Sequence, residues 1–144
     1  MADTVASHVF PTDDGYYAVH LTNQCDGTGE SDVQKVDVSG LKDKDNVAAT
    51  HLVIDYIEWT ISGFNYVVLN FDADTDDLAT VLPAGAGVCD WRNLPAGRDA
   101  PDWPNIGGKI DPQSTGSVGD LLLSTDGAIN GAAYNITIYA RPKA

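Results

Sequence analysis

The sequence predicts an all-β protein, an antiparallel β-sandwich (jelly-roll-like) of about seven to eight strands. Two observations indicate this fold. Several short segments alternate apolar and polar residues with a period of two, which is typical of strands with one buried face. No window carries apolar residues at the spacing of an amphipathic helix. The 144 residues have the length of one domain, so we expect a single sandwich over 1–144.

The N-terminal part of the chain is expected to hold two strands. Residues 17–22 alternate apolar and polar side chains, and a polar, glycine-bearing turn follows at 23–30. Val36 and Val38 then alternate with polar residues in a second strand. The charged stretch 41–50 is most simply a solvated loop.

The middle of the chain gives the strongest hairpin signal. Residues 52–61 alternate, and Ile57 and Trp59 share the buried face. A Ser-Gly pair ending at Gly63 interrupts the pattern before a second β-rich segment at 64–71. We therefore expect the chain to reverse at this pair.

Three further segments complete the predicted sandwich. Residues 78–82 are a short apolar segment, and 118–124 and 134–140 are strands separated by a turn. In the last strand, Tyr134 and Ile136 should face the core.

A long proline- and glycine-rich stretch, 83–117, interrupts the strands and is expected to be a loop insertion within the domain. It holds Trp91 and Trp103, two of the three tryptophans. A short strand around 88–91 is one possibility. A loop of this length is more often functional than idle, and tryptophan supplies large, stiff contact area. The alternative is that both tryptophans fold back over one end of the sandwich.

The charge of the chain limits its partners. Twenty-one acidic residues against eight basic ones give a net charge of −13. Nucleic acid and anionic membranes would be repelled, because both are bound through Lys and Arg. No apolar run approaches the ~20 residues that cross a bilayer. The N-terminus lacks the basic and apolar regions of a signal peptide, so we expect synthesis in the cytoplasm.

The two cysteines, Cys25 and Cys89, are predicted to be reduced, partly buried thiols. A disulfide would require their strands to meet, which the sequence leaves open. The histidines stand apart, with no metal-ligand spacing, so no zinc site is expected.

The acidic segment 72–77 resembles a calcium loop at first sight. An EF-hand needs Gly at the sixth position and Glu at the twelfth, and these positions hold Asp77 and Pro83. We expect a solvated turn whose Asp side chains accept hydrogen bonds from nearby amides. A cation held in another geometry is the alternative.

No arrangement of residues predicts catalysis or a cofactor. The segment 116–119 is one residue short of a nucleophile elbow, and a strand follows it rather than a helix. Glu58 falls on the strand face opposite Trp59 and is expected to point outward. The sequence therefore predicts a protein that is not an enzyme.

Four segments resemble small head decoration (cement) proteins of tailed bacteriophages. They are 20–30 (HLTNQCDGTGE), 57–64 (IEWTISGF), 119–128 (GDLLLSTDGA) and 134–141 (YNITIYAR). The likeness covers most of the chain and lies in strands and turns. The region 89–106 is longer than in the proteins it resembles, so its role carries over least.

This resemblance implies a virion structural protein, a homotrimer seated on the outer capsid at three-fold or quasi-three-fold axes. Its partner would be the major capsid protein, whose neighbouring subunits it would clamp. Such a protein needs complementary surface and no cofactor, and linked copies bind more durably than single ones. Because Trp and Arg are enriched at binding hot spots, the candidate contact residues are Trp91, Arg92, Arg98 and Trp103.

Two other functions fit the sequence. A carbohydrate-binding module would stack a sugar on Trp91 or Trp103 beside carboxylates. A head-completion or tail component would differ from a decoration protein only in symmetry and copy number.

Overall fold

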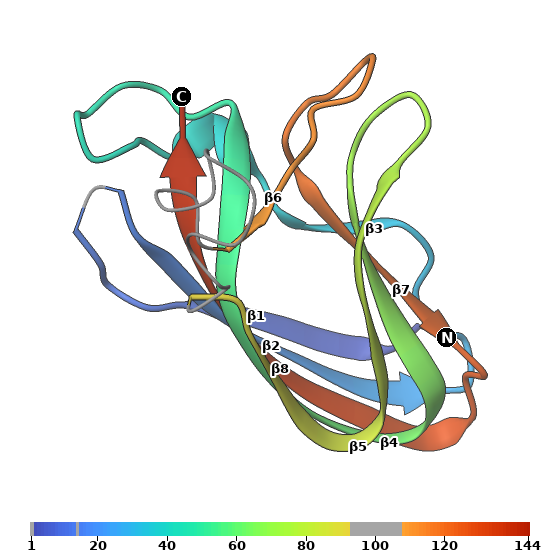
Figure 1. The fold of residues 1–144 in the computed structure, drawn as a ribbon. Helices are drawn as coiled ribbons and strands as arrows, with labels where there is room; N and C mark the ends of the chain where they lie inside the picture. The colour runs from blue at the N-terminus through green and yellow to red at the C-terminus, as the bar shows by residue number, and fades with distance from the viewer. Residues whose placement is uncertain (1, 14, 93–107) are drawn as a thin grey trace, which may run out of the picture.

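The computed structural model describes residues 2–13, 15–92 and 108–144, and these form an all-β, antiparallel structure with eight strands (Figure 1). The predicted fold class is confirmed. The elements are β1 (Thr4–Val9), β2 (Tyr17–Asp26), β3 (Val33–Val36), the 3-10 turn η1 (Val38–Gly40), β4 (His51–Phe71), β5 (Asp77–Asp90), β6 (Lys109–Ile110), β7 (Leu121–Asp126) and β8 (Asn130–Lys143).

All the strands belong to one sheet that curls into two facing layers. The order is β1-β2-β8-β4-β7-β3, with β5 and β6 also paired to β4. The first part of β4 pairs with β8 and its last part with β7, while β5 follows both parts. One layer is therefore β1, β2, β8, the first part of β4 and the end of β5. The other is β3, β7, the end of β4 and the start of β5 (Figure 1).

The hairpin predicted at Gly63 is wrong, because β4 continues through this residue from His51 to Phe71. Gly63 has φ +86°, and a Cβ there would lie 2.8 Å from Ala132. The glycine bends the strand between the layers instead of reversing it, as glycine does at sheet corners. The pairing with β5 skips between Ile61 and Tyr66 at the same point. The real hairpin joins β4 to β5 through the acidic turn at 72–76.

The expected loop over 83–117 begins later than the sequence pattern suggested. Its first residues, through Asp90, belong to β5 and pair with β4, so the strand considered around 88–91 is part of a longer one. Pro83 is tolerated there because β5 pairs only with β4 in the described part of the chain, and proline is accepted on edge strands. The charged loop 41–50 is confirmed, with a single β-bridge between Lys42 and Ala48.

The core lies between the two layers and is built from the alternating residues that the sequence identified. Tyr134, Ile136 and Ile138 are 1%, 0% and 2% exposed, and Trp59 is 8% exposed. The neighbouring residues on the same strands face outward. The described residues contain no helix with the length and apolarity needed to cross a membrane.

A buried polar network ties the turn after β2 to β8. The carboxylate of Glu30 accepts hydrogen bonds from the Tyr134 hydroxyl (2.5 Å) and the Asn23 amide (2.8 Å). Its other oxygen lies 2.5 Å from the Lys35 ammonium, and both side chains of this ion pair are about 95% buried (5% and 4% exposed). Asn23 also donates to Asp3, which accepts from backbone amides of the same turn.

Candidate binding surfaces

The four predicted contact residues fall into two groups. Arg98 and Trp103 lie outside the described residues. Trp91 follows β5 directly and is partly buried against the core. Its backbone amide donates to the Asp55 carbonyl, and its carbonyl accepts from the Gly108 amide, both at 2.9 Å. Trp91 therefore fastens the end of β5 to the sandwich, and only part of its indole remains accessible.

Arg92 is exposed but engaged on both sides. Its Nε and Nη2 atoms donate to the Asp90 carboxylate at 2.9 and 2.8 Å. Its guanidinium also lies 4.8 Å from the ring centroid of Tyr56, within reach of a cation–π contact. The hydrogen bonds from Arg92 lower the pKa of Asp90. The charge of Arg92 is thus compensated locally.

An exposed apolar surface, which we call the apolar patch, covers the outer side of the β4–β5 hairpin. It consists of Tyr66, Val68, Leu78, Val81 and Pro83, which face outward on paired strands. Leu78, Val81 and Tyr66 are 57%, 44% and 38% exposed.

The part of the apolar patch on the edge strand β5 lies in a run without charge. No residue from Leu78 to Cys89 is charged, although the chain as a whole carries −13. Interface cores are depleted of charged residues in this way, and edge strands usually carry charges that discourage contact. The patch was not predicted from the sequence, although this uncharged run was a signal for it.

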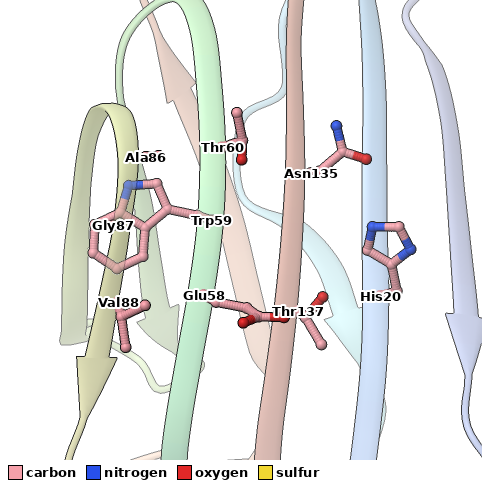
Figure 2. Close-up of a pocket in the computed structure, with 9 residues that line it drawn as sticks. All are labelled: His20, Glu58, Trp59, Thr60, Ala86, Gly87, Val88, Asn135 and Thr137. Carbon is pink, nitrogen blue, oxygen red and sulfur yellow. The ribbon is translucent and has the colours of Figure 1, made fainter.

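A second surface, the outer-face groove, runs over the other layer. Figure 2 shows its polar part, where outward side chains of β2, β8 and β4 lie side by side. Cross-strand pairing sets them in rows: His20, Thr137 and Glu58 form one row. Thr60 and Asn135 belong to the next. Glu58 is exposed on this face, which confirms its predicted orientation.

The aromatic part of the groove begins on the other side of the His20 row, away from Asn135. Tyr139 pairs with Tyr56, and their rings meet edge to face with centroids 5.6 Å apart. The Tyr56 hydroxyl donates to Glu58 at 3.3 Å, so the aromatic and polar parts are connected. Burial and the neighbouring Glu58 raise the pKa of Tyr56.

Trp59 closes the groove on the β5 side, where its ring lies against Gly87 (Figure 2). The indole Nε1 donates to the Pro83 carbonyl at 3.0 Å. A Cβ on Gly87 would lie 2.4 Å from the ring, so glycine is required for this approach.

The acidic turn after β4 behaves as a capped turn, as predicted. Asp76 accepts from the Ala73 amide at 3.2 Å, and Asp77 accepts from the Ser114 hydroxyl at 2.8 Å. Burial and the nearby carboxylates of Asp76, Asp120 and Asp32 raise the pKa of Asp72. Among the described residues, no three His, Cys, Asp or Glu side chains converge to hold a metal ion.

The two cysteines are not joined in a disulfide. Cys25 is buried in the core, and Cys89 is partly buried on β5. Burial raises the pKa of Cys89, although a hydrogen bond with Thr80 opposes the shift.

The fold and these surfaces define a class: an all-β sandwich with a charge-free apolar patch on one layer and a groove on the other. No family model, curated protein or solved structure matches the chain.

Proposed function

We propose that this protein is a virion structural protein that decorates the outer capsid and stabilises it by binding neighbouring major capsid subunits. The apolar patch is the observation that supports a docking role. The capsid as partner is supported by the resemblance of the strand and turn segments to phage decoration proteins. Membership of a homotrimer, and a place on the outside of the virion, belong to the same proposal.

The composition of the patch suits a protein partner. A chain with a net charge of −13 tends to repel its own copies and other acidic surfaces. The patch offers a place where little charge must be desolvated, since Val81 and Leu78 lie in the uncharged run from Leu78 to Cys89. Aromatic residues such as Tyr66 are common anchors at such sites.

Trimerisation would make modest contacts durable. When one subunit docks, the linked copies bind at high effective concentration. The individual patch therefore needs only moderate affinity for the capsid. The remaining predicted contacts, Arg98 and Trp103, would add to it, whereas Arg92 is already paired with Asp90.

The test uses particles of the encoding phage that lack this protein, to which purified protein is added back. We expect the wild-type chain to restore full occupancy and heat resistance. Val81→Asp should lower the occupancy about tenfold or more, because a charge would be buried without a partner in the contact. Val47→Asp is the matched control, since Val47 is similarly exposed (52%) but lies in the 41–50 loop.

Particle images from the same experiment give the symmetry and copy number. Density at three-fold axes of the shell supports the proposal, whereas density at a single vertex or on the tail favours a head-completion or tail component. Equal occupancy of the Val81→Asp and wild-type chains would show that the patch is not the anchor.

A further inference from the structure

The outer-face groove has a chemistry unlike that of the apolar patch. We propose that it binds a neutral oligosaccharide, with Tyr139 and Tyr56 as the stacking end and the polar rows on β2, β8 and β4 as the hydrogen-bonding end. This inference is independent of the proposed capsid function.

The aromatic end is held ready for stacking. Tyr139 is 43% exposed, and its ring is supported edge-on by Tyr56. Tyr56 is in turn covered by the Arg92 guanidinium at 4.8 Å. A ring fixed by its neighbours loses little conformational freedom on binding, and the apolar face of a sugar ring packs well on such a surface.

The polar end offers the groups that sugar hydroxyls require. His20, Thr60, Asn135 and Thr137 point outward from three neighbouring strands (Figure 2). None of these side chains forms a hydrogen bond with another side chain of the described residues. Hydroxyl and amide groups both donate and accept, as sugar hydroxyls do, so each can exchange water for ligand.

The size of the groove fits a short oligosaccharide. The polar part has a volume of about 550 Å³ and the aromatic part about 540 Å³, each within the usual range of ligand sites. The two hollows share no lining residue, and Asn135 in one and Tyr139 in the other are about 14 Å apart along β8, at roughly 3.4 Å per strand residue. The site is therefore elongated along β8.

Charge selects against acidic sugars. Glu58, Asp55 and Asp90 lie in or beside the groove. The two cations beside these carboxylates are already held in two-point ion pairs, Arg92 by Asp90 and Arg141 by Asp55. A sialylated or uronic-acid glycan would be repelled by the Glu58 carboxylate in the polar part of the groove, and both nearby cations are already paired, so the expected ligand is neutral.

A saccharide fits this surface better than a protein does. A protein interface usually has an apolar core, and the apolar patch supplies one elsewhere on the molecule. In the polar part of the groove the central side chains, Thr137 and Asn135 on β8, are uncharged and polar, and the exposed aromatic rings of Tyr139, Tyr16 and Phe10 lie at the other end.

The test is an array of neutral gluco-, manno- and galacto-oligosaccharides, with sialylated and uronic-acid glycans as charged arms. Calorimetry with the neutral oligosaccharides that bind then compares three full-length chains: wild type, Tyr139→Ala and Tyr66→Ala. We expect Tyr139→Ala to weaken binding about tenfold or more, the loss typical of a truncated aromatic anchor. Tyr66, with a similar exposure of 38%, lies on the apolar patch and should be neutral.

A second variant, Asn135→Ala, keeps the proposal testable if Tyr139→Ala folds poorly. Asn135 is exposed, and its loss should also weaken binding. The proposal is overturned if no neutral glycan binds, if only acidic glycans bind, or if binding is unchanged in both groove variants. Loss of particle binding by Tyr139→Ala without any glycan binding would instead assign the face to a protein partner.

Discussion

Removing the buried charge of Glu30 should destabilise the fold more than any exposed substitution. Its carboxylate is 5% exposed and holds the Lys35 ammonium, which is 4% exposed, at 2.5 Å. It also accepts hydrogen bonds from Tyr134 and Asn23. The substitution Glu30→Gln keeps the shape of the side chain and leaves the Lys35 charge buried without its counter-ion.

The magnitude follows from the geometry of the pair. Removing one partner of a buried ion pair costs about 3–5 kcal/mol, mainly because the remaining charge is uncompensated. A domain has a free energy of unfolding of about 5–15 kcal/mol, so this loss is a large fraction of the total. Replacing both partners should cost much less, since Glu30→Gln with Lys35→Met leaves no unpaired charge.

Urea denaturation followed by tryptophan fluorescence measures these free energies. The cycle comprises the wild type, Glu30→Gln, Lys35→Met and the double variant. The matched control is Asp90→Asn, which breaks the exposed ion pair with Arg92 and should have little effect. A loss below about 1 kcal/mol in Glu30→Gln, or a double variant equal to the sum of the singles, would refute this reasoning.

Two other predictions concern the fold. Burial raises the pKa of Asp111, which is 2% exposed, so its ionised form is unfavourable in the folded chain. Asp111→Asn should therefore raise the free energy of unfolding at pH 7, by a margin that disappears below the ordinary carboxyl pKa of 3.8; a margin that grows in acid would contradict this. Gly87→Ala should lower the free energy of unfolding by about 1–3 kcal/mol through overpacking, because its Cβ would lie 2.4 Å from the Trp59 ring. Gly40→Ala, with nothing within 4 Å, is its control, and equal stabilities would show that the ring yields freely.

Period-two alternation was sufficient to predict the fold class and most of the core. Tyr134, Ile136 and Ile138 are buried as the pattern indicated. One face of β8 lies against the core and the other faces outward along most of the strand. The β1 strand was missed. All six of its residues are exposed, so it has no buried face to produce the pattern on which the prediction depends.

The hairpin was predicted wrongly because a local glycine signal has two meanings. Gly63 permits a positive φ, which serves a reversal or a bend equally well. Here Ala132 approaches the glycine closely, and β7 and β8 pair with β4 on either side of it. These contacts are distant in sequence, so only the folded chain decides between the two.

The candidate surfaces were harder to predict than the fold, for a related reason. The groove places His20 beside Thr137 and Glu58 through the register of three strands, and no single segment contains that arrangement. The tryptophans drew attention to the long loop, yet Trp91 is largely a packing residue. The uncharged run that begins at Leu78 was visible, but its edge position was not.

The bend at Gly63 also separates the two proposed activities. Residues before it on β4, such as Glu58, face the groove, and residues after it, such as Tyr66, face the apolar patch. The outer faces of two packed layers point in opposite directions, so a chain docked through the patch would leave the groove open to solvent. If so, Val81→Asp should keep saccharide binding while losing capsid occupancy, and Tyr139→Ala should do the reverse. Joint loss of both activities in either folded variant would mean that the two surfaces are not independent.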